Sequence, residues 1–268
     1  MYCYMKQSEH ANSIEKALRI LLCFQAERPS WGVRELGMHL GFSPATVQRV
    51  LQTLKTHGFV AQDPVTRRYQ LGVVFYTFVH ALKGTYPISR AGQPFLQQLM
   101  ADTGETVHLN IIEGEDRVCI DTVESPRALK ASMPIGSRSP LYAGGSSKCL
   151  LAFWDRDLRE RYLRNLSVLK PFTDRTVTDP EVLRRELEEI RGQGYAASLG
   201  ERNRGLGSLS APVFDHHGQL LATVSLAIPE IRYQDTTHRH FCIRKLLDTA
   251  RALSRVMGYE SDERAARK

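Results

Sequence analysis

The sequence predicts an α+β protein with two domains. Its 268 residues exceed what one domain of ordinary size needs. Apolar residues make up 42% of the chain and charged residues 24%, which is typical of a globular protein and not of a disordered one. Helical periodicity dominates the N-terminal part, whereas helical and alternating patterns are mixed after residue 87. Helices that flank a mostly antiparallel sheet are therefore expected in the second domain.

Residues 33–60 have the pattern of two helices joined by a tight turn. Gly41 suits the end of the first helix, because glycine adopts the left-handed conformation at little cost. Ser43 offers a hydroxyl N-cap to the second helix, and Pro44 fits its first position. The apolar residues of the second helix have the spacing of one buried face: Val47, Val50, Leu51 and Leu54.

The opposite face of the second helix carries donors and acceptors suited to base edges and phosphates, and no carboxylate. Two short strands are expected next, at 59–62 and 68–71, joined by a turn that begins with Asp63-Pro64. This hairpin after a helix-turn-helix is the winged arrangement, which would bring two wing arginines to DNA. The alternative is an ordinary small α/β domain whose polar helix face is only solvated. The helix cap, the apolar periodicity, the turn and the hairpin all favour the winged helix-turn-helix over this alternative. The expected DNA contacts are Arg34, Ser43, Thr46, Gln48, Arg49, Gln52, Lys55, Arg67 and Arg68.

The remaining elements follow from local patterns. A helix capped by Asn12 or Ser13 is expected to end at Pro29. An apolar helix at 71–82 needs partners on two sides, so we expect it to link the domains and pack against a second copy of the chain. In the second domain we expect helices at 89–103, 146–153, 156–166, 180–193 and 241–257, and strands at 106–113, 117–123, 129–133, from 194, at 209–214 and at 220–228.

These patterns divide the chain into five segments. They are a disordered lead (1–11), a winged helix-turn-helix domain (12–72), a linker helix (73–86), an α+β domain (87–259) and a polar tail (260–268).

The net charge of +7 is concentrated toward the N-terminus. Residues 1–75 contain nine Lys or Arg against five Asp or Glu, a net +4, whereas the remaining 193 residues contain 27 against 24, a net +3. A polyanionic partner such as DNA favours this distribution. The five cysteines contain no C-x-x-C pair and fit a reducing cytoplasm. Neither a signal peptide nor an apolar run of ~18–20 residues is present, so we expect a cytoplasmic protein without membrane association.

An enzyme or sensor domain with an appended DNA-binding module is the alternative function. Residues 144–148 lack the G-x-x-x-x-G-K-[ST] spacing of a phosphate-binding loop. Cys149 lies in an apolar run, which favours a buried helix residue over a nucleophile. The histidines at 216–217 and 238–240 do not repeat a zinc-site spacing. We therefore predict no catalytic residue, no metal and no cofactor. An architectural DNA-binding protein would leave the second domain unexplained.

Five ordered segments carry a family resemblance. They are S-P-A-T-V-Q-R-V-L-Q-T-L at 43–54, R-R-Y-Q-L-G at 67–72, P-L-Y-A-G-G-S-S-K-C-L-L-A at 140–152, G-Y-A at 194–196 and G-L-G-S-L-S-A-P-V-F-D-H-H-G at 205–218. Together they resemble the IclR-type (isocitrate lyase regulator) transcription factors of bacteria over roughly residues 12–258. The resemblance implies a winged helix-turn-helix joined to a GAF-like effector domain. It also implies dimers, or dimers of dimers, on palindromic DNA operators. A small organic or aromatic acid would change the affinity for DNA or for RNA polymerase.

The resemblance also implies an effector site. Its neutral donors, together with backbone N–H groups at the start of the helix after Gly145, would hold a carboxylate without an obvious Arg or Lys. Some family members have an acidic residue where Ser198 stands and a cysteine where Ser208 stands, so the effector of other members is not carried over. Transferred position by position, the site comprises Ala131, Ser139, Gly145, Ser146, Ser198, Leu206, Ser208, Ser225 and Ala227.

Overall fold

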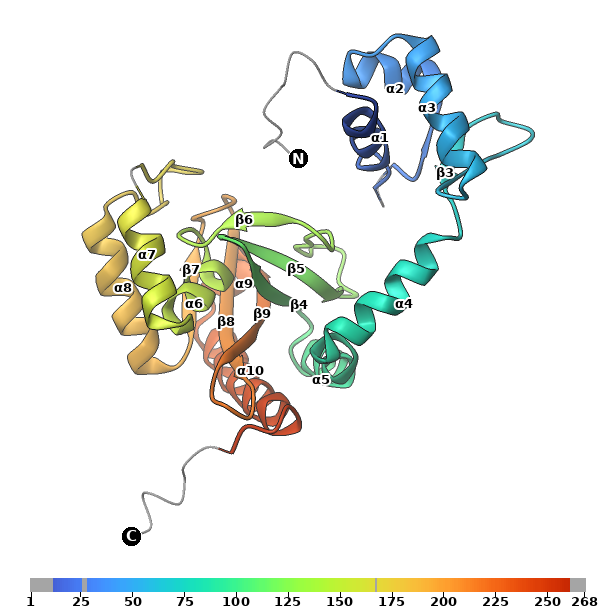
Figure 1. Ribbon diagram of the computed structural model, residues 1–268. Helices are drawn as coiled ribbons and strands as arrows, with labels where there is room; N and C mark the ends of the chain where they lie inside the picture. Colours follow the sequence, from blue (N-terminus) through green and yellow to red (C-terminus); the bar gives the residue numbers. More distant parts are fainter. Residues whose placement is uncertain (1–11, 26–27, 167, 261–268) are drawn as a thin grey trace. The chain divides into compact units, whose positions relative to one another are not determined.

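The computed structural model describes residues 12–25, 28–166 and 168–260 (Figure 1). The chain divides into two compact units, Met1–Tyr86 and Pro87–Lys268. The expected lead at 1–11 and all but the first residue of the expected tail lie outside the described residues. Among the residues that are described, no helix has both the length and the apolar character to cross a membrane.

Unit 1 is a winged helix-turn-helix, as the sequence predicts. Its elements are α1 (Ser13–Leu21), β1 (Ser30–Trp31), α2 (Val33–Leu40), α3 (Pro44–Thr56), β2 (Val60–Gln62) and β3 (Tyr69–Leu71). Gly41 ends α2 in the left-handed conformation with a φ of 71°, and the Ser43 side chain accepts a hydrogen bond from the Thr46 N–H at the start of α3. The four apolar residues predicted for the inner face of α3 are buried in the core of this unit. The predicted turn between α2 and α3, the N-cap of α3 and the buried face of α3 are confirmed.

The small sheet of unit 1 has a third strand that the sequence analysis missed. β1 pairs antiparallel with β3, which gives the strand order β1-β3-β2. The prediction that the first helix continues to Pro29 is wrong, because α1 ends at Leu21. Trp31 in β1 is buried, and its indole N–H donates to the Cys23 carbonyl at 2.8 Å. A strand of two residues is too short to show alternation in the sequence.

The predicted linker helix is present as α4 (Phe75–Thr85). Phe59 in unit 1 contacts both Phe75 and Phe78, with ring centroids 5.7 and 5.9 Å apart, so the start of α4 packs on the wing. The rest of the helix leaves large apolar side chains exposed, with Tyr76 at 78% and Leu82 at 55% of full exposure. A helix that is apolar on several sides needs further partners to bury those sides.

Unit 2 contains one antiparallel six-stranded sheet with helices on both faces (Figure 1). The strand order is β6-β5-β4-β9-β8-β7. The strands are β4 (Thr106–Glu113), β5 (Asp116–Val123), β6 (Arg138–Pro140), β7 (Ala196–Leu199), β8 (Leu206–Phe214) and β9 (Leu220–Pro229). The helices are α5 (Pro87–Thr103), α6 (Gly145–Phe153), α7 (Arg156–Asn165), α8 (Pro180–Gln193), α9 (Glu230–Tyr233) and α10 (Thr236–Val256). The predicted α+β class is confirmed.

Three local predictions in unit 2 are wrong. The strand expected at 129–133 is irregular chain, and the edge strand is β6 instead, where no strand was expected. Two factors explain the difference: Pro134 lacks a backbone donor, and Arg138 in β6 is held by Glu113 and Asp116. The last helix begins at Thr236, well before the expected 241, because the Asp235 side chain caps it. The one-turn helix α9 was not predicted.

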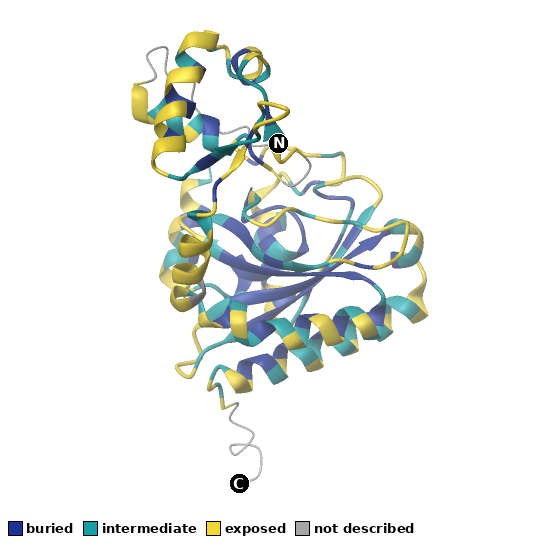
Figure 2. Cartoon of the chain, turned by 90° about the vertical axis from the view of Figure 1, so that its right-hand side faces the viewer, coloured by how far each residue is buried: buried dark blue, intermediate teal, exposed yellow. Residues whose placement is uncertain are grey.

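The two faces of the larger sheet differ in chemistry. One face is apolar, with Leu109 and Leu253 both close to Gly92 of α5, so α5 and α10 pack tightly on it. The other face lies under α6 and is rich in polar side chains that are nevertheless buried. Figure 2 shows these strands coloured mostly as buried, whereas the helix that leads to the C-terminus alternates between buried and exposed residues. A buried polar sheet face is unusual, because polar groups removed from water require hydrogen-bond partners.

Candidate DNA-binding face and effector site

The outer face of α3 is exposed and polar, as a recognition helix requires. Gln48, Arg49, Gln52 and Lys55 are all exposed, on the side of α3 away from its buried residues. The amide of Gln48 donates to the Tyr69 hydroxyl at 3.3 Å, which orients the amide toward the wing. Among the residues described, Arg49 has no side-chain hydrogen bond and no ion pair. Its guanidinium is therefore free to reach a base edge or a phosphate.

The predicted contacts near the start of α3 and in α2 are either helix-capping residues or exposed residues. Ser43 accepts from the Thr46 N–H at 3.2 Å, and the two hydroxyl oxygens lie 2.9 Å apart. Both predicted contacts therefore already serve the start of the helix, where N–H groups also suit a phosphate. Arg34 is exposed in the first turn of α2.

The two wing arginines have different surroundings. Arg68 donates to both carboxylate oxygens of Glu35 at 3.1 and 2.9 Å, and its Nε donates to the Ser30 hydroxyl at 3.0 Å. Hydrogen bonding from Arg68 is the main reason that the pKa of Glu35 is lowered to about 2. Arg68 thus fastens the wing to α2, and its assignment as a DNA contact stays a prediction. Arg67 is exposed at the turn of the wing, with a φ of 59°.

The strand register brings most of the predicted effector residues onto one sheet face. Ser198 pairs with Ser208, and Ser208 pairs with Ala227, so these three residues form a row across β7, β8 and β9. Ser225 lies two residues before Ala227 on β9 and shares its face. Leu206 lies two residues before Ser208 and is partly buried on the same face. This is the polar face under α6.

The N-terminus of α6 contacts this face. A Cβ atom on Gly145 would lie 2.9 Å from the Ser208 hydroxyl, which explains why only glycine fits there. The hydroxyl oxygens of Ser139 in β6 and Ser147 in α6 lie 3.2 Å apart. Ser146 is partly exposed beside them. Ala131 lies in the irregular segment between β5 and β6, and no contact in the described residues joins it to the other predicted site residues.

The structure adds five residues that the sequence analysis missed. Arg117 Nε donates to Ser139 Oγ at 2.8 Å, and its Nη1 donates to Asn110 Oδ1 at 3.3 Å. In turn, Asn110 Nδ2 and Ser210 Oγ donate to Ser225 Oγ at 3.2 and 2.8 Å. Arg117 thus contacts a predicted site residue, whereas the sequence analysis expected a site with no obvious Arg or Lys. The added residues are His108, Asn110, Arg117, Ser147 and Ser210.

His108 is buried on the same face and pairs across the sheet with Ser225. Its Nδ1 lies 2.9 Å from the Thr122 hydroxyl. Burial, and to a smaller extent the charge of Arg117, lowers the pKa of His108 to about 4. The imidazole is therefore neutral at physiological pH and acts in the network as a hydrogen-bonding group.

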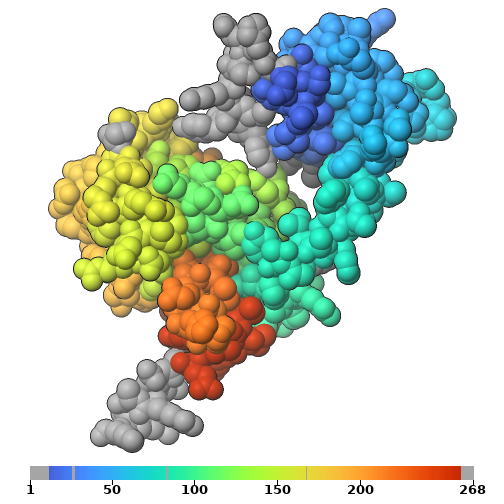
Figure 3. Space-filling view, in the orientation of Figure 1, coloured from blue at the N-terminus to red at the C-terminus, as the bar shows by residue number. Residues whose placement is uncertain are grey.

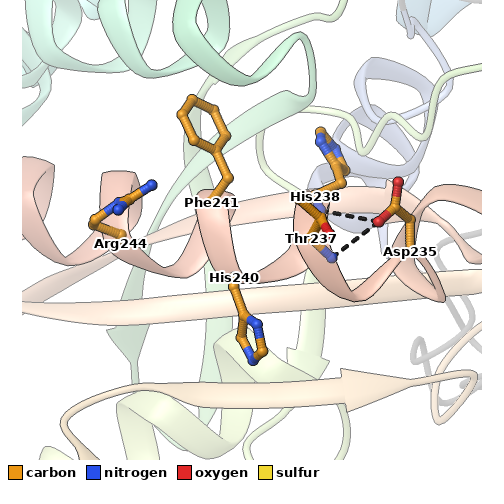
Figure 4. Close-up of a pocket in the computed structure, with 6 residues that line it drawn as sticks. All are labelled: Asp235, Thr237, His238, His240, Phe241 and Arg244. Carbon is orange, nitrogen blue, oxygen red and sulfur yellow. Dashed lines mark hydrogen bonds between the residues drawn. The ribbon is translucent and has the colours of Figure 1, made fainter.

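The alternative sites considered from the sequence acquire ordinary structural explanations. Burial raises the pKa of the Cys149 thiol far above its usual value, which disfavours a nucleophilic thiolate. Figure 4 shows a surface hollow at the start of α10, where Asp235 accepts from the N–H groups of Thr237 and His238. The His238 ring lies 2.9 Å from the buried carboxylate of Glu105. No group of three or more metal-binding side chains occurs within the described ranges.

A winged helix-turn-helix joined to an α+β domain with a buried polar site is the organisation of a two-domain transcriptional regulator. The sequence profile described as "Bacterial transcriptional regulator IclR C-terminal" matches residues 80–255, and that of the "IclR helix-turn-helix domain" matches residues 13–64. The chain belongs to the IclR family of bacterial transcriptional regulators.

Known relatives agree with this assignment. The HTH-type transcriptional regulator KdgR of Escherichia coli (strain K12) is 32% identical over 254 residues, which are 95% of each chain. The crystal structure of the Thermotoga maritima IclR is 30% identical, covers 93% of this chain and 100% of that chain, and has a TM-score of 0.78. An IclR homologue from Microbacterium hydrocarbonoxydans, crystallised with 4-hydroxybenzoate, shares the fold at 21% identity and a TM-score of 0.77, with 92% and 99% of the two chains covered.

Arg68→Ala should lower the melting temperature of the protein, because it breaks the contacts that hold the wing to α2. Arg67→Ala is the matched control, since the Arg67 side chain is exposed, and it should leave the melting temperature unchanged. Circular dichroism melting of the two full-length variants makes the comparison. Equal melting temperatures would show that the Glu35 contacts of Arg68 do not stabilise the wing.

His108 should make the protein less stable as the pH falls. An unfolded histidine takes up a proton near pH 6.5, whereas folded His108 resists protonation down to a pKa of about 4. The unfolded state therefore binds more protons between these values, and the free energy of unfolding should fall by about 2 kcal/mol from pH 7 to pH 5. His108→Asn should remove this part of the loss in urea unfolding at both pH values. The exposed-site variant His240→Asn should retain it, and the same loss in both variants would refute the assignment.

Proposed function

We propose that this protein is a ligand-controlled transcriptional regulator that reads a palindromic DNA operator as a dimer or a dimer of dimers. A small organic or aromatic acid binds in unit 2 and changes the affinity for DNA or for RNA polymerase, and the protein catalyses no reaction. One observation carries the proposal: a free recognition face on α3 and a buried polar site on the larger sheet occur in the same chain.

The DNA part of the proposal rests on the exposed face of α3. Its side chains are neutral or cationic, and α3 contains no carboxylate to repel phosphates. Arg49, Gln52 and Lys55 are the side chains best suited to bases and phosphates, with Arg67 on the wing for the backbone or the minor groove. Neutralisation of several phosphates makes binding steeply dependent on salt concentration.

The dimer part of the proposal rests on α4. Val73 and Tyr76 are about four-fifths exposed, and Leu82 is about half exposed. A contiguous set of large exposed apolar side chains on one helix is characteristic of a surface that another protein covers. A second copy of the same chain is the simplest partner, because a two-fold dimer presents two recognition helices to the two halves of a palindrome.

The ligand part of the proposal rests on the buried polar face under α6. Serine hydroxyls and the backbone N–H groups at the start of α6 are suited to an acid group. The homologue from Microbacterium hydrocarbonoxydans holds an acid of this type, 4-hydroxybenzoate. That protein shares the fold with this chain.

Arg49→Ala should weaken operator binding by ~1–3 kcal/mol, because it removes a base or phosphate contact. The operator is first obtained by selecting bound duplexes from a random DNA library with the full-length protein. Affinity for the selected duplex is then measured by fluorescence anisotropy at fixed salt concentration. The control is Arg255→Ala, an exposed arginine on α10, which should leave the affinity unchanged. Unchanged affinity in Arg49→Ala would contradict the proposed orientation of α3.

Tyr76→Asp combined with Leu82→Asp should convert the protein into monomers, because each carboxylate would have to be desolvated in an apolar interface. Light scattering coupled to gel filtration measures the mass directly, and the wild type should have at least twice the monomer mass. The matched control is Ile231→Asp, an equally exposed apolar residue on α9 of unit 2. A wild-type monomer, or a variant that keeps its oligomeric mass, would rule out α4 as the interface.

A further inference from the structure

Arg117 is a buried cation without a counter-charge. Arg117 is only 4% exposed, and its three acceptors are all neutral: Ser139 Oγ, Asn110 Oδ1 and the Met133 sulfur. Within the described residues, no carboxylate lies at ion-pair distance from it. Some other buried charges in unit 2 have charged partners, such as Glu105 with Arg232 and Lys148 with Glu201. Buried Asp121 has only neutral partners, among them Gln93 and Ser89. Arg117 is likewise a buried charge with only neutral partners.

This arrangement is energetically unfavourable in the free protein. A charge removed from water costs several kcal/mol unless an opposite charge and hydrogen bonds compensate for it. Burial lowers the pKa of Arg117 to about 10, so the guanidinium remains protonated at neutral pH. Neutral oxygens satisfy part of its hydrogen bonding but do not neutralise it. An uncompensated buried cation in a protein interior is more easily explained by a ligand than by stability.

The N-terminus of α6 adds a second positive element at the same place. The N-cap residue Gly144 provides no side-chain cap, whereas Asp155, Asp179 and Asp235 cap three other helices of unit 2. In the described part of the chain, the N–H groups of the first α6 turn, residues 145–147, have no acceptor. Buried N–H groups at a helix start without acceptors are a ready site for an anion.

Hydrogen bonds connect the two positive elements. The Ser139 hydroxyl lies between Arg117 Nε, at 2.8 Å, and the Ser147 hydroxyl in the first turn of α6, at 3.2 Å. The Glu201 carboxylate, which holds the turn before α6, is already engaged, since its two oxygens accept from Lys148 Nζ and from the Gly144 N–H. Among the described residues, no carboxylate forms an ion pair with Arg117 or accepts from the first turn of α6.

A replaceable group occupies one position beside the guanidinium. The Met133 sulfur, a weak acceptor, lies against Arg117 Nη1. Met133 belongs to the irregular segment 124–137, which lies between β5 and β6 and is visible at the surface as green atoms in Figure 3. Arg127 of this segment donates to the buried carboxylate of Glu105 at 3.3 Å, and the Leu129 carbonyl accepts from Arg232, which also donates to Glu105. A charged oxygen would bind the guanidinium more strongly than a thioether does.

We propose that Arg117 is the residue that recognises the charge of the effector. An acid group lies between its guanidinium and the first turn of α6, and one oxygen of that group replaces the Met133 sulfur. The proposal rests on the proposed function and makes it more specific. The effector must be an anion, and its neutral amide must not bind. Carboxylate and phosphate share the required chemistry, and the experiment distinguishes them.

The test compares acids with their amides. The melting temperature of the full-length wild type is measured with benzoate, 4-hydroxybenzoate, gluconate, the primary amide of each, and inorganic phosphate. Bound ligand raises the melting temperature by mass action. At least one anion should raise it while its amide does not, and a response to phosphate alone would identify a phosphate site. Titration calorimetry then gives the Kd of the active compound.

Two variants link that response to Arg117. Arg117→Gln should weaken binding of the anion at least tenfold, and Arg117→Lys, which keeps the charge, should recover part of the affinity. Ser139→Ala removes only the bridging hydroxyl and serves as the second variant if Arg117→Gln fails to fold. The matched control, Arg255→Gln, should bind as the wild type does.

The contrary outcomes are separable. An amide as effective as its acid, or full affinity in both Arg117→Gln and Ser139→Ala, would overturn the assignment of Arg117 and leave the regulator itself intact. Failure of every anion to bind the wild type would overturn the acid effector, and this inference with it. DNA binding by the same preparation, measured in parallel, shows whether the recognition function survives in either case.

Discussion

The buried ammonium of Lys148 fixes the position of α6, and the effector site depends on that position. Its Nζ atom lies 2.5 Å from Glu201 and 2.8 Å from Glu186, and its side chain is 3% exposed. The second oxygen of Glu201 accepts the Gly144 N–H at 3.0 Å, so one carboxylate holds both the lysine and the turn before α6. Removing one partner of such a pair costs about 3–5 kcal/mol, because a buried charge is left alone. The first turn of α6 is therefore held rigidly against Ser208.

This constraint explains why the two faces of the larger sheet have separate roles. The apolar face under α5 and α10 buries leucines and valines and contributes hydrophobic stabilisation to unit 2. The face under α6 buries a connected network of serines, Asn110 and Arg117, whose hydrogen bonds offset part of the cost of removing them from water. The Thr223 hydroxyl on that face is an exception, since it has no partner in the described residues. On the α6 side, a separate apolar cluster of α6, α7 and α8 supplies stability, so the polar strand residues beneath α6 can serve recognition.

Local patterns determined what could be predicted from the sequence. The cap at Ser43, the left-handed Gly41 and the buried stripe of α3 depend on neighbouring residues, so the winged domain was predictable down to single positions. The serines of the effector site came from the family resemblance. Arg117 was not predictable, because it follows a hairpin turn, where an arginine is ordinarily exposed. Its burial depends on pairing with β6, and β6 was hidden in a segment that resembles a loop. Arg68 shows the same limit, since its partner Glu35 is 33 residues away.

Communication between the effector site and the DNA-binding unit is constrained by the chain itself. A ligand can change DNA affinity only by binding two arrangements of the protein unequally. Within one chain, the covalent route between the units runs through Tyr86 and Pro87 into the first turns of α5. Those turns are bound to the strand that carries Arg117: the Asp121 carboxylate of β5 accepts from Gln93 at 2.6 Å and from Ser89 at 3.4 Å. A shift of β5 on ligand binding therefore acts on the element that continues into α4. These hydrogen bonds between β5 and α5 make a small displacement at Arg117 difficult to absorb locally, because packed interiors transmit strain.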